Sequence, residues 1–71
     1  MRILTPRQKE VLMFIAEYIN THSIAPVIRE ISQHFDITIQ GAQDHVDALR
    51  RKGYLTYKPH HWRSIVILKL N

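Results

Sequence analysis

Apolar positions near the start of the chain repeat at the spacing of one face of an α-helix. They are Val11, Leu12, Phe14, Ile15, Tyr18 and Ile19. The residues before them are typical of a helix start, because Thr5 can cap the first turn, Pro6 suits the first helical position and Gln8 completes a capping box. A polar run at residues 20–23 follows, so the pattern predicts a helix over residues 6–20.

A second, shorter apolar stripe begins after Pro26, which cannot continue the first helix because proline lacks an N–H. Its apolar positions, Ile28, Ile31 and Phe35, lie three and four residues apart. This spacing predicts an amphipathic helix over residues 27–35, followed by a tight turn at residues 36–37.

The third stripe consists of Ala42, Val46 and Leu49. Thr38 is the expected N-cap, and Gly53 suits the left-handed position that follows a helix end. The pattern therefore predicts a helix over residues 39–52.

Beyond Gly53 the period changes from helical to extended. Residues 54–58 and 64–69 are rich in β-branched and aromatic side chains, and a short segment containing Pro59 separates them. These features predict an antiparallel β-hairpin. The expected fold is mainly α with this small hairpin: a single three-helix winged helix-turn-helix domain over residues 1–71, in which the hairpin tip, residues 59–63, is the wing.

Charge divides the chain into two parts. Residues 1–49 hold four basic and six acidic side chains, whereas residues 50–71 hold six basic side chains and no carboxylate, within a net charge of +4. A segregated positive charge commonly faces a polyanion, although a solvated basic surface without a partner has the same composition.

Composition excludes several other classes of protein. The chain has no cysteine for disulfides or thiolate chemistry, no signal-peptide pattern, and no apolar run near the ~20 residues that cross a bilayer. We therefore expect a cytoplasmic, nucleoid-associated protein without membrane contact. Five histidines are scattered without metal-ligand spacing, no serine has triad partners, and so short a chain leaves little room for a pocket of ~300 Å³. We expect no metal, no cofactor, no small-molecule ligand and no enzymatic activity.

The third predicted helix carries the chemistry expected of a base-reading helix. If its apolar stripe faces inward, its other face exposes short polar side chains near its N-terminus, where glutamine can read adenine and aspartate can accept from cytosine. The residues expected at base edges are Thr38, Ile39, Gln40, Gly41, Gln43 and Asp44, with Asp47 on the same face. Gly41 is expected to let the backbone approach a phosphate or a base edge.

Basic residues elsewhere are expected to contact the DNA backbone, and those of the wing to contact the backbone or the minor groove. They are Arg7, Arg50, Arg51, Lys52, Lys58, His60, His61 and Arg63. Trp62 stays open between a DNA contact and a lid over the small core.

These residues together resemble the N-terminal DNA-binding domain of LexA repressors. The resemblance is carried by Leu4-Thr5-Pro6-Arg7-Gln8, Val11, Leu12, Ala25-Pro26, Arg29-Glu30-Ile31, Gly41-Ala42, His45-Val46, Ala48-Leu49 and Lys52-Gly53-Tyr54-Leu55. It implies a bacterial winged helix that represses DNA-damage-response (SOS) genes and reads inverted-repeat operators with its third helix. It also implies base contacts by Gln40, Gly41, Gln43 and Asp44, and a wing contact by Arg63.

The chain departs from the family pattern at several points. LexA proteins continue into a self-cleaving domain with a serine and lysine pair, whereas this sequence ends at Asn71, so we carry no peptidase activity over. The family usually has threonine or serine at Val27, glycine at Asp36 and glutamate at Asp44. The resemblance therefore carries no operator sequence over.

Two functions remain at this stage. The first is sequence-specific binding of double-stranded DNA, by a chain that is monomeric alone and dimeric on an inverted repeat. The second is protein–protein docking without DNA binding, because winged helices also serve that purpose. A contiguous apolar patch on the third helix would favour docking, and a basic patch joining that helix to the wing would favour DNA binding.

Overall fold

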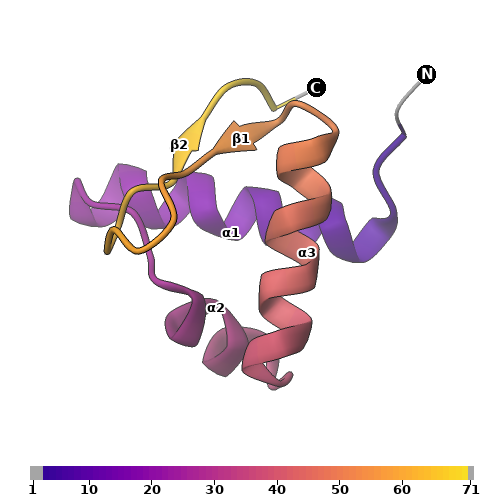
Figure 1. Cartoon of the computed structure of the whole chain (residues 1–71), viewed down its shortest axis with the longest axis horizontal. Coiled ribbons are helices and arrows are strands. Elements are labelled where there is room, and N and C mark those ends of the chain that lie inside the picture. The colour runs from indigo at the N-terminus through magenta and orange to yellow at the C-terminus, as the bar shows by residue number, and fades with distance from the viewer. Residues whose placement is uncertain (1–2, 71) are drawn as a thin grey trace.

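The computed structural model describes residues 3–70, which form three helices and a two-stranded antiparallel sheet (Figure 1). The elements in chain order are α1 (Pro6–His22), α2 (Ile28–Phe35), α3 (Ile39–Arg51), β1 (Leu55–Thr56) and β2 (Val66–Ile67). In Figure 1, α3 stands upright in front of α1, and α2 lies below α1. The predicted mainly α fold with a small hairpin is confirmed.

Helix α1 begins as the sequence predicts and ends two residues later. Thr5 Oγ1 accepts from Gln8 N–H at 3.1 Å, and Gln8 Oε1 accepts from Thr5 N–H at 3.1 Å. The expected end at residue 20 is wrong because polar side chains on an exposed turn do not stop a helix. The helix ends instead where Ser23 takes a left-handed conformation and its N–H donates to Ile19 O.

Helix α2 is one residue shorter than predicted because Val27 is its N-cap. Valine has no side-chain acceptor for the first turn, so only the other half of a capping box is present: Glu30 Oε1 accepts the Val27 N–H at 2.8 Å. At the other end, Asp36 takes the left-handed conformation (φ 54°) and directs the chain into α3. Asp36 therefore adopts the backbone conformation that glycine takes most readily.

Helix α3 is capped by Thr38 as predicted, since Thr38 Oγ1 accepts from Gly41 N–H at 2.9 Å. It ends at Arg51, with Lys52 as the C-cap rather than the last helical residue. Gly53 follows with φ 84°, the left-handed position expected for it.

The hairpin lies where the sequence predicts, but its strands are much shorter than residues 54–58 and 64–69. Only Leu55↔Ile67 and Thr56↔Val66 pair. On the loop side of these pairs the backbone ladder ends. There the Ser64 hydroxyl accepts from Lys58 N–H and donates to Lys58 O in place of a backbone partner. Residues 57–65 thus form a loop that contains the wing.

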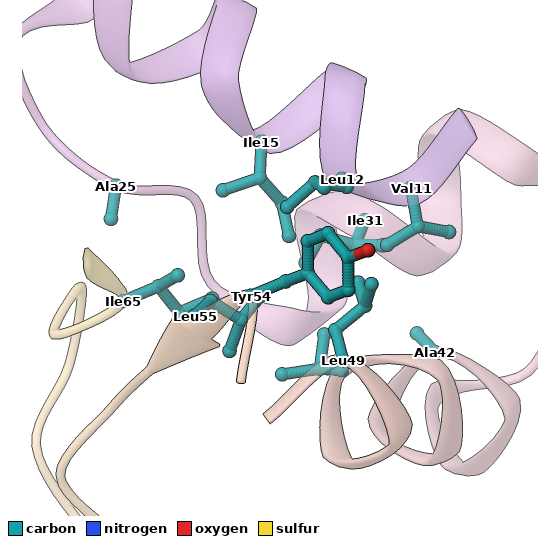
Figure 2. Packing of buried hydrophobic residues seen from close by; sticks show 11 residues of the cluster. Val11, Leu12, Ile15, Ala25, Ile31, Ala42, Leu49, Tyr54, Leu55 and Ile65 are labelled. Atoms are coloured by element: carbon teal, nitrogen blue, oxygen red, sulfur yellow. The ribbon is translucent and has the colours of Figure 1, made fainter. Parts of the chain in front are cut away.

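One hydrophobic core lies between the three helices and the hairpin (Figure 2). Its buried members are Val11, Leu12, Ile15, Ala25, Ile31, Ala42, Val46, Leu49, Tyr54, Leu55 and Ile65. Because Ile65 follows the wing and Leu55 precedes it, both sides of the hairpin are fixed to the core. No helix within residues 3–70 is long and apolar enough to cross a membrane.

Candidate nucleic-acid interface

Helix α2, the turn at residues 36–38 and helix α3 form a helix-turn-helix. The inner face of α3, with Ala42, Val46 and Leu49, is fully buried against the other elements. On the outer face Thr38, Ile39, Gln40 and Asp44 are exposed, as the sequence predicts. Gln43 and Asp47, which were expected on the same exposed face, are half-buried.

Gly41 lies at the cap of α3. A Cβ at this position would lie 3.1 Å from Thr38 Oγ1 and 4.0 Å from Ile37 Cβ. The missing side chain therefore faces the chain's own N-cap. The expected close approach of the Gly41 backbone to DNA stays a prediction, and a Cβ here would crowd the Thr38 hydroxyl that caps α3.

Two hydrogen bonds on α3 pair an amide with a carboxylate one turn later. Gln40 Nε2 donates to Asp44 Oδ1 at 2.9 Å, and Gln43 Nε2 donates to Asp47 Oδ1 at the same distance. Each bond fixes a side chain that is expected to read bases. The exposed Gln40 and Asp44 pair presents an amide oxygen and a carboxylate to any ligand of this face.

The Gln43 and Asp47 pair extends to Tyr57 at the start of the loop. Tyr57 Oη donates to Asp47 Oδ1 and accepts from Gln43 Nε2 at 3.1 Å, and the Arg50 guanidinium lies 4.7 Å from the Tyr57 ring centre. The hydrogen bond to Asp47 raises the pKa of Tyr57 above its usual value. This network attaches the beginning of the loop to α3.

An open groove of about 550 Å³ runs between the start of α2, the outer side of α3 and the loop. The short length of the chain predicts little room for a pocket of ~300 Å³. The groove is larger than that because the loop, attached to α2 and α3 near its two ends, forms its third side. Ile39, on the α3 side of the groove, is 52% exposed. Trp62, on the loop side, is 83% exposed, so it is not a lid over the core.

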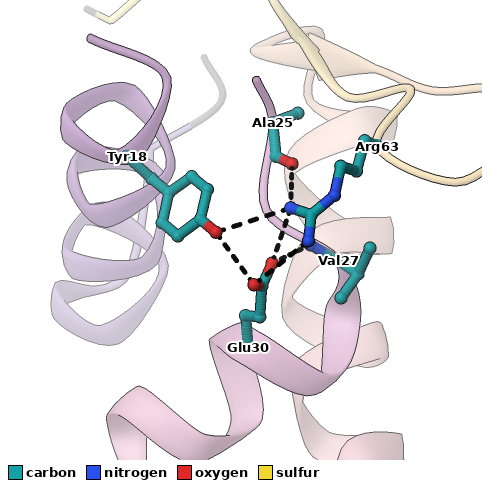
Figure 3. A network of polar contacts seen from close by, with 5 residues as sticks. All are labelled: Tyr18, Ala25, Val27, Glu30 and Arg63. Atoms are coloured by element: carbon teal, nitrogen blue, oxygen red, sulfur yellow. Dashed lines mark hydrogen bonds and ion pairs between the residues drawn. The ribbon is translucent and has the colours of Figure 1, made fainter. Parts of the chain in front are cut away.

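The predicted backbone-contacting residues lie in three different places. Lys58, His60 and His61 are exposed along the groove. Arg63 also borders the groove, but its guanidinium turns toward Glu30 of α2 (Figure 3), with Nη1 2.9 Å from Glu30 Oε1. Loop and α2 are therefore joined by an ion pair.

The other basic residues lie outside the groove-lining set. Arg50 and Arg51 are exposed on the last turn of α3. Lys52 Nζ donates to Ile3 O at 2.9 Å and to Gln8 Oε1 at 2.7 Å, which joins the end of α3 to the start of α1. The Arg7 guanidinium lies 5.2 Å from the Phe35 ring centre. Arg7 and Lys52 thus have intramolecular partners.

The groove also contains residues that sequence reasoning did not select. Arg29 lies exposed at its α2 side, and Tyr57 borders it on the loop. A signal for Arg29 was available, because it is the only lysine or arginine between Lys9 and Arg50. For Tyr57 the sequence held no comparable signal, since its partners lie on another element. Within residues 3–70, no group of three or more histidine or acidic side chains could hold a metal ion.

A helix-turn-helix whose second helix shares a groove with a hairpin loop defines a winged helix-turn-helix domain. Residues 1–64 match the family model of the LexA DNA binding domain. The chain therefore belongs to the LexA DNA-binding domain family, which confirms the resemblance found in the sequence.

Three relatives illustrate the similarity. The chain is 49% identical over 69 residues to the LexA repressor of Thermosipho africanus. The matched region covers 97% of this chain and 35% of the relative. The chain is 46% identical over 70 residues to the LexA repressor of Myxococcus xanthus, with 97% and 32% covered, and 39% identical over 71 residues to that of Leptospira biflexa, with 100% and 35% covered. The chain spans about a third of the length of these relatives.

Proposed function

We propose that this chain is the DNA-binding part of a LexA-like transcriptional repressor and binds double-stranded DNA sequence-specifically. The observation that carries the proposal is the exposed first half of α3, with Ile39, Gln40 and Asp44, beside a groove whose other side is the cationic loop. This arrangement fits a major groove for α3 and the adjacent backbone or minor groove for the wing. Membership of the LexA DNA-binding domain family supports it.

Base recognition is assigned to the N-terminal half of α3. The proposed contacts are made by Thr38, Ile39, Gln40, Gly41, Gln43 and Asp44. Ile39 can pack on a thymine methyl group, and the Asp44 carboxylate can accept from cytosine N4. Gln43 must release a hydrogen bond to Tyr57 or Asp47 before it can donate to a base, because both of its N–H donors are used.

Attraction to the DNA backbone is assigned to the loop and to the end of α3. Lys58, His60 and His61 are exposed beside the groove, and Arg50 and Arg51 are exposed at the end of α3. Phosphate contacts of this kind fix register and supply most of the non-specific affinity.

The proposal extends to the oligomeric state of the chain and its location in the cell. We propose that the chain is monomeric alone and dimeric on an inverted repeat, with half-sites about one helical turn apart or a multiple of that distance. It acts by binding and has no catalytic activity of its own. Since bacterial DNA lies in the cytoplasm, the chain acts there, at the nucleoid.

The test is selection of binding sites from random duplex DNA, followed by titration of the selected half-site, its inverted repeat and a scrambled duplex. We expect the tightest binding on the inverted repeat, weaker binding on the half-site, and the weakest on the scrambled duplex. Equal affinity for all three duplexes would refute sequence-specific recognition, and no binding to any of them would favour the docking function instead.

A further inference from the structure

The Arg63 guanidinium makes four hydrogen bonds to residues outside its own loop (Figure 3). Its Nη1 lies 2.9 Å from Glu30 Oε1, 3.0 Å from Ala25 O and 3.4 Å from Tyr18 Oη, and its Nη2 lies 3.3 Å from Glu30 Oε2. Because Nη1 carries two hydrogens, three acceptors use its donor capacity completely. A phosphate could take this nitrogen only by displacing its present partners.

The partners of Arg63 are themselves fixed. Glu30 accepts the Val27 N–H at the start of α2 and the Tyr18 hydroxyl at 2.8 Å. The hydrogen bond from Arg63 is the main cause that lowers the pKa of Glu30 to about 2. The carboxylate is therefore charged at every pH at which DNA binding is measured.

The backbone of the loop requires such support. His60 and Arg63 both have positive φ, 65° and 53°, a conformation that non-glycine residues adopt at a cost. The loop is held at both ends, by the Tyr57 bond to Asp47 of α3 and by the Arg63 bonds to Glu30 of α2. Between these two attachments lie the exposed Lys58, His60, His61 and Trp62.

We propose that Arg63 is a positioning residue for DNA binding: through Glu30 it fixes the loop relative to α2, and the ion-paired Nη1 does not contact DNA. This inference rests on the proposed function. The ion pair pre-orders the loop, so that binding does not have to supply the cost of ordering it. The role replaces the direct backbone contact that the sequence predicts for Arg63.

The Glu30→Gln variant distinguishes a phosphate contact from a positioning role, because the two roles predict opposite changes in DNA affinity. If Arg63 contacts phosphate, removal of the competing carboxylate frees the guanidinium and removes a negative charge near DNA, so affinity stays the same or rises. If Arg63 positions the loop, the same change weakens binding. Glutamine keeps one oxygen for the Val27 N–H, so the cap of α2 is retained.

A double-mutant cycle and a salt series make the test quantitative. We expect Glu30→Gln and Arg63→Ala each to weaken binding to the selected and the scrambled duplex by about fivefold to tenfold. The slope of log K against log salt should stay unchanged, and the double variant should bind like Arg63→Ala alone, because both changes break one interaction. Glu17→Gln, which removes the same charge from an exposed site on α1, is the matched control and should bind as wild type does.

Trp62 supplies a readout in the absence of DNA. It is the only tryptophan of the chain and precedes Arg63, so its fluorescence anisotropy decay reports local motion of the loop. We expect faster local motion in Glu30→Gln and Arg63→Ala, and unchanged motion in Glu17→Gln. Thermal unfolding followed by circular dichroism checks that each variant is folded at the temperature used.

Three results would overturn the inference. They are a Glu30→Gln variant that binds as tightly as wild type or more tightly, an Arg63→Ala variant whose salt slope falls by about one, and unchanged Trp62 motion in both variants. A wild-type chain that binds none of the duplexes would instead refute the proposed function. Tight wild-type binding with an unaffected Glu30→Gln variant refutes the role of Arg63 alone.

Discussion

Asp44 is an exposed carboxylate on the helix proposed to enter the major groove, where phosphate repels negative charge and only a base contact compensates. We expect Asp44→Ala to cost roughly 1 to 3 kcal/mol on the selected duplex and little on the scrambled one. Titration of both duplexes checks this, with Glu17→Gln as the control for a general charge effect. Equal losses on the two duplexes would show that Asp44 reads no base.

Glu30 gives the chain an acid-sensitive interaction. Its pKa is about 2 in the folded chain and near 4.3 in an unfolded one, so the ion pair with Arg63 stabilises the fold above about pH 4.3. This contribution is lost as the pH falls through about 2. We expect the difference in free energy of unfolding between wild type and Glu30→Gln to shrink between about pH 4.5 and pH 2. A difference that stays constant over this range, measured by denaturant unfolding, would contradict the assignment.

Among the elements, the helices were predictable because their signals are local. The Thr5 and Gln8 capping box, the Thr38 cap and Gly53 all act within a few residues of the helix end that they define. The strand lengths were not predictable, because the Ser64 hydroxyl occupies the Lys58 N–H and carbonyl just beyond the last pair of the ladder. The alternation of residue types gives no information about such a competing partner.

In the candidate site, too, features set by nearby residues were predictable and features set by distant residues were not. The exposed residues on the first turns of α3 were predictable from one helical stripe. The surroundings of Arg63 were not, since its partner Glu30 lies 33 residues earlier in the chain. The basic composition of the C-terminal part suggests a phosphate contact for Arg63, whereas in the folded chain its guanidinium binds the Glu30 carboxylate.

Tyr57 couples the loop to α3, and its removal tests that coupling. Tyr57→Phe loses the hydrogen bond to Asp47, so we expect a loss of roughly 0.5 to 1.5 kcal/mol in the free energy of unfolding at neutral pH. Because the folded pKa of Tyr57 is raised, the bond stabilises the chain below about pH 10 and this contribution is lost as the pH rises through the folded value. The difference between wild type and Tyr57→Phe should therefore shrink above pH 10. Denaturant titrations at pH 7 and at alkaline pH measure it, and a variant as stable as wild type at pH 7 would contradict the role of this bond.

Across the whole molecule, positive charge is concentrated after residue 49, and its surroundings decide which cations are available to DNA. Lys58 is exposed beside the groove, so Lys58→Ala should lower the salt slope by about one. Lys9 lies exposed on α1 outside the groove-lining residues, and Lys9→Ala is the matched control with an unchanged slope. Titrations at several salt concentrations give both slopes. Equal slopes for the two variants would show that the groove does not face the DNA backbone.

We expect this winged helix to read DNA sequence through α3. The most direct measurement is the ratio of affinities for the selected inverted repeat and a scrambled duplex, for wild type and for Asp44→Ala at one salt concentration. We expect wild type to prefer the selected duplex and Asp44→Ala to reduce this ratio by roughly 5- to 150-fold, equivalent to about 1 to 3 kcal/mol. Selection that enriches no sequence, or a ratio of one for wild type, would show that α3 reads no DNA sequence.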